Sequence, residues 1–304
     1  MRTLRPTLIM ISLLGFAAAA AAQLAPAWMV PAAASTPGEY GTFWLTDLSI
    51  HNPHAEGLPV AVQALPSGQE NWSVPTLRVD VPGYATVNLW DALGPDGLAL
   101  DGTAALLVWV DRDPADCPGA ACDIYVSSRT YTPDPLSEDG EFGQTIPAER
   151  IDEGVAWDGL GYLAGVLNDG VAFRCNVGAA SWTADWTTVR VDVQDADGAI
   201  LATEELVVPP FGHVQHRLAT PIEGGSLVFY LVDGPDDALV FPYASVVNRA
   251  TGDASYLSAR WSVVGVGIAS MDAVSLAATA RPRPEPAGPM RIVRPGPRTA
   301  ARRR

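Results

Sequence analysis

Hydrophobic and polar side chains alternate in many short stretches of the chain. In VRVDVQ, residues 189–194, every second residue is a valine, and the residues between them carry charged or amide side chains. A period of two predicts a β-strand with one buried and one solvent-facing side. Turn-forming sequences such as PSG at 66–68 and DADG at 195–198 end these stretches. The pattern therefore predicts short antiparallel strands, without a long amphipathic helix between them.

The same hydrophobic blocks occur twice, in the same order. A repeated order of several blocks indicates two copies of one folding unit. The matched blocks are WLTDLSIHNP (44–53) with FRCNVGAASW (173–182), VPGYATVNL (81–89) with VPPFGHVQH (208–216), and GTAALLVWVD (102–111) with GSLVFYLVD (225–233).

From this repeat we predict an all-β chain with two tandem antiparallel β-sandwich domains. The domains are expected at residues 27–149 and 155–260, joined by the acidic, glycine-containing stretch around 149–159. The 28 glycines and 26 prolines fit this class, because both residue types favour turns over helix interiors.

The first 22 residues are typical of an export signal. Two arginines precede an apolar run, and the run ends in the small residues Ala20, Ala21 and Ala22. This is the order of a cleavable signal peptide, and the apolar run is short for an uncleaved anchor that spans a bilayer. We therefore expect residues 1–22 to be removed and the mature protein to be secreted, either periplasmic or extracellular.

The segment 261–304 is expected to be a low-complexity tail rich in proline and arginine. Its first part, 261–280, is apolar and precedes eight arginines, as in a sorting signal that anchors a protein in a membrane. Asp272 lies within that part, however, and a central carboxylate costs about 2.5 to 3.5 kcal/mol on insertion. We predict a disordered basic extension and no transmembrane span in the mature chain.

The distribution of charge excludes one class of partner. The net charge is −15, although the leader and the tail together hold ten of the 19 basic residues. The body between them is therefore strongly acidic, whereas binding to a phosphate backbone requires clustered positive charge. We expect no nucleic-acid partner.

The three cysteines divide into a pair and a single residue. Cys117 and Cys122 lie in DCPGAACD, where Pro-Gly favours a tight turn, and export permits disulfides, so we predict a bridge between them. A zinc site is the weaker interpretation, because no further Cys or His motif completes four ligands. Cys175 lies in a predicted strand, and we expect it to be a buried, inert thiol rather than a nucleophile.

Signatures of catalysis are absent from the sequence. His213 and His216 lie three apart on a predicted strand, so their side chains should point to opposite faces and cannot chelate one ion together. His51 and His54 flank a loop and are weak candidates for metal binding. No catalytic, cofactor-binding or metal-ligating residue is therefore assigned.

Calcium is the one cofactor for which we note a weak possibility. The DADG turn resembles part of a calcium loop, but Val193 occupies the position of the first carboxylate, which favours an ordinary hairpin. Four aspartates surround the predicted disulfide and are better placed for a structural calcium ion: Asp111, Asp113, Asp116 and Asp123.

Two tryptophans stand where the first copy of the repeat has an Asn-Pro loop. Trp182 and Trp186 would suit ligand contacts if they were exposed, because an aromatic side chain can stack on a sugar or anchor a protein partner. Packing in the core or at the hinge between the domains is the alternative.

Six short segments of the sequence form a recognisable set: GTFWLTDLSIHNP, SSRTYTPD, EFGQTIPA, FRCNVG, DADG and PPFGHVQ. Together they resemble an uncharacterised family of secreted bacterial proteins. The resemblance covers most of residues 30–260 and implies tandem Ig-like β-sandwich repeats, with no catalytic residues. The chain departs from the family pattern at Cys175, where Thr is usual, in the segment 182–186 and in the tail.

These observations lead to a functional hypothesis. We expect a secreted or cell-surface, non-enzymatic module of the structural or adhesion type, with an unknown protein or glycan of the cell envelope or the exterior as its partner. The first alternative is a carbohydrate-binding module that uses Trp182 or Trp186. The second is an unrecognised metal-assisted hydrolase.

Overall fold

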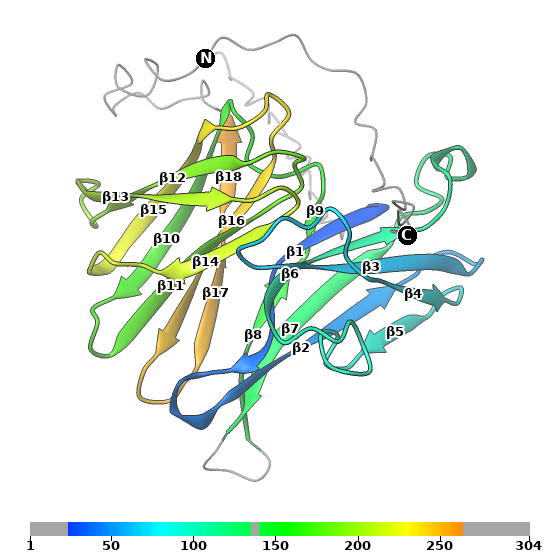
Figure 1. The fold of residues 1–304 in the computed structure, drawn as a ribbon, viewed down its shortest axis with the longest axis horizontal. Coiled ribbons are helices and arrows are strands. Elements are labelled where there is room, and N and C mark those ends of the chain that lie inside the picture. The colour runs from blue at the N-terminus through cyan, green and yellow to red at the C-terminus, as the bar shows by residue number, and fades with distance from the viewer. Residues whose placement is uncertain (1–23, 135–139, 264–304) are drawn as a thin grey trace, which may run out of the picture.

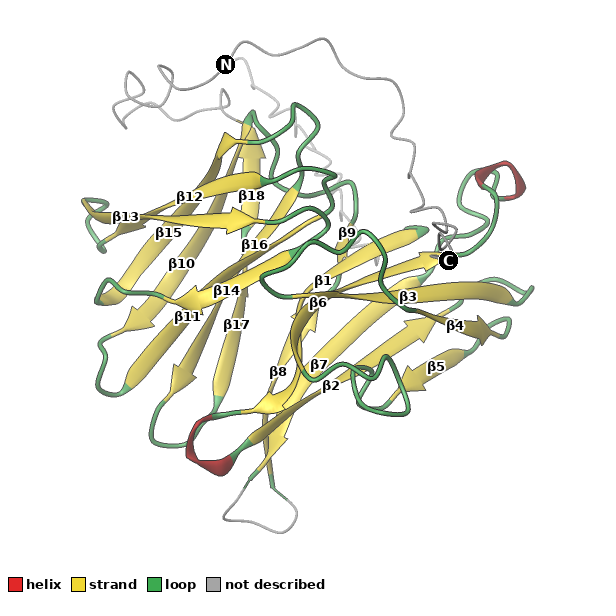
Figure 2. Ribbon diagram, viewed as in Figure 1, coloured by secondary structure: helices red, strands yellow, loops and turns green. Residues whose placement is uncertain are grey.

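The computed structural model describes residues 24–134 and 140–263, and this part of the chain is all-β (Figures 1 and 2). It contains antiparallel strands and two short 3₁₀ helices, η1 (Glu39–Gly41) and η2 (Pro114–Asp116), and no α-helix is found in the described ranges. The expected signal peptide and almost all of the expected tail lie outside these residues. The predicted fold class is confirmed.

The first half of the molecule contains nine strands. One layer has the order β4-β3-β6-β1, with β9 beside β1, and the other layer contains β8, β7, β2 and β5. The end of β1 also pairs with β2, so one continuous sheet folds over into two layers. The strands are β1 (Ala27–Pro37), β2 (Phe43–His51), β3 (Leu58–Pro66), β4 (Thr76–Val81), β5 (Thr86–Leu89), β6 (Gly102–Val110), β7 (Tyr125–Pro133), β8 (Glu141–Pro147) and β9 (Glu149–Arg150).

The second half has two separate sheets. Their strand orders are β13-β12-β15-β10-β18 and β14-β11-β16-β17. The strands are β10 (Gly159–Asn168), β11 (Phe173–Ser181), β12 (Thr187–Gln194), β13 (Ile200–Val208), β14 (His213–Arg217), β15 (Ile222–Asp233), β16 (Val240–Asn248), β17 (Ala254–Ser258) and β18 (Arg260–Val263).

The two halves have the same strand order, element by element. Each strand from β1 to β9 has its counterpart nine strands later, at the same place in its layer. Loops correspond as well: the Tyr84 N–H donates to the His54 carbonyl at 2.9 Å, and the equivalent Phe211 N–H donates to the Thr183 carbonyl at 2.8 Å. The sequence repeat is therefore a repeat of structure.

Each half closes with a short strand in a segment where the sequence predicts a linker or a tail. Glu149 and Arg150 pair with β1 in place of opening the linker, and β18 carries the second half to Val263, three residues beyond the expected end at 260 and into the expected tail. Short edge strands bury few side chains, so they lack the alternation by which a strand is recognised in sequence.

Each half has its own buried core, and a third cluster joins the two halves. In β12 the valines 189, 191 and 193 are completely buried, as the alternation predicts. The third cluster packs Met29, Leu65 and Leu107 of the first half against Ala180 and Phe241 of the second. Burial of these apolar side chains favours the docked arrangement over two independently moving domains.

Candidate functional site

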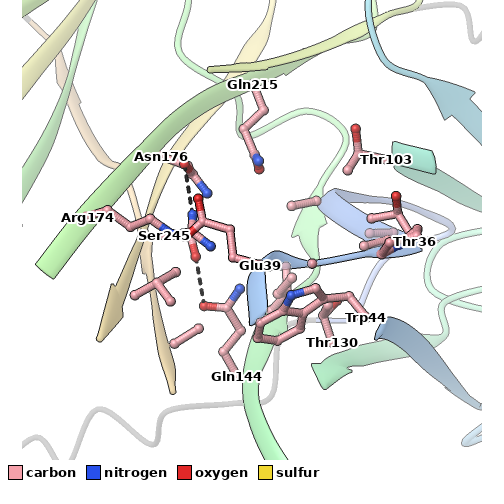
Figure 3. Close-up of a pocket in the computed structure, with 18 residues that line it drawn as sticks. Thr36, Glu39, Trp44, Thr103, Thr130, Gln144, Arg174, Asn176, Gln215 and Ser245 are labelled. Atoms are coloured by element: carbon pink, nitrogen blue, oxygen red, sulfur yellow. Dashed lines mark hydrogen bonds and ion pairs between the residues drawn. The ribbon is translucent and has the colours of Figure 1, made fainter. Parts of the chain in front are cut away.

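A cleft of about 460 Å³ lies between the two halves and is lined by residues of both. Its floor is the alanine-rich part of β1, and polar side chains surround it (Figure 3). This volume falls within the range of sites that hold small molecules, roughly 300 to 1,000 Å³. The larger polar and aromatic side chains in its lining include Glu39, Trp44 and Gln144 of the first half and Arg174, Asn176 and Gln215 of the second.

An ion pair spans the mouth of the cleft. Arg174 Nε on β11 lies 3.4 Å from Glu39 Oε2 on η1, and Arg174 Nη1 donates to Asn176 Oδ1 at 3.3 Å. Arg174 is mostly covered whereas Glu39 is half exposed, with 14% and 50% of their side chains accessible. The guanidinium is therefore the fixed member of the pair, and the carboxylate is the member that can move.

Trp44 supplies an aromatic wall. It lies on β2 next to the turn that follows β1, and a Cβ on Gly38 would lie 2.6 Å from the indole Nε1. Only glycine at that position allows the ring to lie so close to the turn. Figure 3 shows the indole beside Thr130, at the edge of the cavity opposite Gln215.

A chain of hydrogen bonds runs behind the cleft and links the two halves. The Thr103 and Ser67 hydroxyls lie 2.7 Å apart, Ser67 Oγ contacts His213 Nδ1, and His213 Nε2 lies 2.7 Å from the Tyr243 hydroxyl. Tyr243 in turn donates to Gln215 Oε1 at 2.8 Å. Both ends of this chain, Thr103 and Gln215, line the cleft.

The Ser67–His213 pair does not have the arrangement of a hydrolytic triad. The second imidazole nitrogen faces a tyrosine hydroxyl, where a triad has a carboxylate. Complete burial lowers the pKa of His213 to about 3, so the neutral ring is a poor proton acceptor near neutral pH. The pair can connect the halves and orient Gln215, but it is not equipped to activate Ser67.

The structure separates the two tryptophans that the sequence singled out. Trp182 is half-buried where the halves meet, with its ring centroid 4.8 Å from that of Phe211, which also contacts Trp72. Trp186 is 47% exposed. The aromatic contacts of the described residues pair Trp182 with Phe211 and not with Trp186, so the two do not form one aromatic surface.

A carboxyl group also lies largely covered between the halves. Glu149 on β9 accepts a hydrogen bond of 2.6 Å from the Ser258 hydroxyl on β17. Its burial raises its pKa to about 7, and the Ser258 hydrogen bond and nearby Arg260 offset this only in part. This contact between the halves is therefore sensitive to pH.

The cysteines have the predicted arrangement. Cys117 and Cys122 form a disulfide with a Cα–Cα distance of 5.2 Å, which confirms the predicted bridge. Cys175 is free and completely buried, and its burial raises the pKa of the thiol to about 12. A thiol that stays protonated and covered is a poor nucleophile, in agreement with the sequence.

The other candidates are engaged in local contacts. Asp113 caps η2 through the Ala115 N–H, Asp111 pairs with Arg78 at 3.0 Å, and the structural calcium ion at this loop stays a prediction. Within residues 24–134 and 140–263, no three His, Cys, Asp or Glu side chains gather as a metal site. His213 is buried and His216 is exposed beside Glu204, so they face opposite sides, as expected.

The residues of the cleft were not identified from the sequence, although one signal was present. Arg174 and Asn176 are the outward-facing residues of a strand whose inward-facing residues, Cys175 and Val177, are completely buried. Polar residues at such positions are ordinary on a solvated face, so their function emerges only when the halves dock.

Comparison with known proteins gives little further information. No family model and no curated protein matches the chain. Among solved structures, the chain is similar to Bacteroides uniformis β-glucuronidase 2 covalently bound to cyclophellitol-6-carboxylate aziridine, at 13% identity over 72% of this chain and 24% of that one. The chain thus spans about a quarter of that protein, and the TM-score of the superposition is 0.17. None of the described residues forms a helix long and apolar enough to cross a membrane.

Proposed function

We propose that this protein is a secreted or cell-surface, non-enzymatic module of the adhesion type, and that it binds a saccharide in the cleft between its two halves. The observation that carries the proposal is the cleft itself, which combines an indole, three side-chain amides and an Arg–Glu pair in a rigid frame. Sugars stack on aromatic rings and exchange hydrogen bonds with amides and charged groups.

The disulfide supports a location outside the cytoplasm. Such bonds persist in oxidising compartments and are rare among cytosolic proteins. The Cys117–Cys122 bridge is consistent with the export signal read in residues 1–22. The resemblance to secreted bacterial proteins with tandem Ig-like repeats points to the same location.

The size and chemistry of the cleft favour a saccharide over a folded protein. Stable protein interfaces bury about 800 Å² on each partner, whereas a cavity of about 460 Å³ admits a short oligosaccharide or a single extended segment. We therefore keep the carbohydrate-binding alternative that the sequence suggests. The aromatic side chain that stacks on the sugar is then Trp44 and not Trp182 or Trp186.

Binding of the mature protein to a glycan array tests this proposal. We expect binding to a subset of the glycans, loss of at least tenfold in affinity in Trp44→Ala, and a clear decrease in Gln215→Ala. Because Gln215 is exposed, its truncation does not endanger the core. Thermal melts check that both variants are folded.

Trp186→Ala is the matched control, because Trp186 is exposed but lies outside the lining of the cleft. Its affinity should equal that of the parent protein. Loss of binding in Trp186→Ala alone would move the site to that surface. An array without any bound glycan, or turnover of a bound glycan that vanishes on a single substitution, contradicts the proposal.

A further inference from the structure

The three amide side chains of the cleft share one feature: a donor of the protein already occupies the carbonyl oxygen of each. Arg174 donates to Asn176 Oδ1 at 3.3 Å, and Tyr243 donates to Gln215 Oε1 at 2.8 Å. Ser245 donates to Gln144 Oε1 at 3.2 Å (Figure 3). Among the described residues, no acceptor pairs with the nitrogen of any of these amides.

The direction of the hydrogen bonds behind the cleft fixes the orientation of Gln215. The single proton of the Tyr243 hydroxyl goes to Gln215, so His213 Nε2 must carry a proton and donate to the tyrosine oxygen. His213 Nδ1 is then unprotonated and accepts from the Ser67 hydroxyl. A buried, neutral imidazole in this tautomer keeps the Gln215 NH₂ group directed at the cleft.

Arg174 adds a fixed positive charge to these donors. Its Nε pairs with Glu39 and its Nη1 donates a hydrogen bond to Asn176. Further N–H groups of the guanidinium are therefore left for a ligand. Among the described lining residues, Glu39 is the only carboxylate and Arg174 the only cation. The cleft is therefore rich in donors, although the body of the protein is acidic.

We infer, resting on the proposed function, that the ligand is an acidic saccharide, whose carboxylate binds at Arg174 and is flanked by the NH₂ groups of Asn176, Gln144 and Gln215. A carboxylate accepts several hydrogen bonds at once and forms its strongest ones with guanidinium groups. The ring that bears it has the Trp44 indole as a stacking partner.

Glu39 is then a competitor for the ligand. Its half-exposed carboxylate occupies part of the guanidinium in the free protein and must yield when a second carboxylate arrives. Arg174 stays in place without it, because Asn176 holds the guanidinium independently. Removal of the charge of Glu39 should therefore strengthen the binding of an acidic ligand relative to that of a neutral one.

Oligogalacturonate and its fully methyl-esterified form are suitable probes, since they share ring stereochemistry and differ in charge. By titration calorimetry with the full mature chain, we expect oligogalacturonate to bind at least tenfold more tightly than the ester, because charge-assisted hydrogen bonds are about twice as strong as neutral ones. Arg174→Gln should remove this preference, and Glu39→Gln should increase the affinity for the acid about threefold relative to that for the ester.

The outcomes separate the inference from the proposed function. Equal binding of acid and ester, or an unchanged preference in Arg174→Gln, overturns the inference while leaving saccharide binding intact. Binding of poly-glutamate in place of both saccharides replaces the saccharide by an acidic peptide and overturns both. Binding of none of these probes overturns the acidic-saccharide inference, and the glycan array then decides the proposed function.

The tautomer of His213 provides a test that needs no ligand. Long-range ¹H–¹⁵N correlation spectra should show a protonated Nε2 and an unprotonated Nδ1 in the parent protein. In Tyr243→Phe, which cannot hold the Gln215 oxygen, the affinity for oligogalacturonate should fall severalfold while Arg174→Gln in the same background still removes the preference for acid. A protonated Nδ1 in the parent protein would contradict an orientation of Gln215 in which its NH₂ group is directed at the cleft.

Discussion

Ser67 Oγ and His213 Nδ1 are hydrogen-bonded although 146 positions separate the two residues in the sequence. The contact joins the turn after β3 to the first residue of β14, and a backbone bond from the Gly68 N–H to the His213 carbonyl at 2.8 Å reinforces it. It connects the two halves behind the cleft, between Thr103 and Gln215, which line it.

His213 should make the protein less stable in acid. Its pKa is about 3 in the folded protein because of burial, and close to 6.5 in the unfolded chain. Between these values only the unfolded chain binds the proton, so the free energy of unfolding falls as pH decreases below 6.5, by about 2 kcal/mol at pH 5. In urea titrations, His213→Gln should be less stable than the parent at pH 7 but should lack this component of the acid dependence. If the free energy of unfolding of His213→Gln depended on pH between 7 and 5 as steeply as that of the parent, His213 would not be buried as a neutral ring.

Glu149 should have the opposite effect. Its pKa is raised by burial to about 7, against 4.5 for the ordinary carboxyl group, so between these values the folded protein binds a proton that the unfolded chain lacks. The stability contributed by the protonated form is therefore present below about pH 4.5 and lost as pH rises through 7, by about 3 kcal/mol in total. Glu149→Gln keeps an acceptor for Ser258 and should be more stable than the parent at pH 8. The two proteins should become similar in stability near pH 4.5, and a parent that is the more stable at pH 8 contradicts this prediction.

Phe211 and Tyr84 form a matched pair for measuring how strongly the halves are docked. They occupy equivalent turns with left-handed backbone, at φ of 45° and 58°, but Phe211 packs between Trp72 and Trp182 whereas Tyr84 is 71% exposed. Phe211→Ala should reduce the free energy of unfolding by about 2 kcal/mol or more, because it removes aromatic packing between the halves. Tyr84→Ala should change it by less than about 0.5 kcal/mol. If the two substitutions had equal effects, packing between the halves would not contribute to the free energy of unfolding through Phe211.

The disulfide should stabilise the protein modestly. Cys117 and Cys122 are five positions apart, so the bridge closes a short loop and removes little entropy from the unfolded chain. Loss of the bridge in the double variant with serine at both positions should cost about 2 kcal/mol and leave saccharide binding intact, since neither residue lines the cleft. Chemical denaturation with and without reductant provides the comparison, and a loss of binding on reduction would link this loop to the cleft.

Much of the fold could be predicted from residues that interact within one half. The alternation in β12 reports which valines face the core, and the turn sequences at 66–68 and 195–198 do follow strands. The bridge between Cys117 and Cys122 was predictable for the same reason, since five residues of chain already hold the two sulfurs near each other. The candidate site was not predictable, because Arg174, Asn176 and Gln215 look like ordinary outward-facing strand residues until the other half docks beside them and a cleft forms.

Trp182 illustrates the limit most directly. Its sequence context is compatible with an exposed aromatic surface or a hinge contact, and its packing against the cluster of Met29, Leu65 and Phe241 places it at the contact between the halves. The strands, the repeat and the acidic body follow from the sequence alone, because side-chain alternation and turn chemistry act over a few residues. The packing of the two copies and the polar cleft that they enclose become visible in the folded chain, since they depend on which side chains meet across more than a hundred residues.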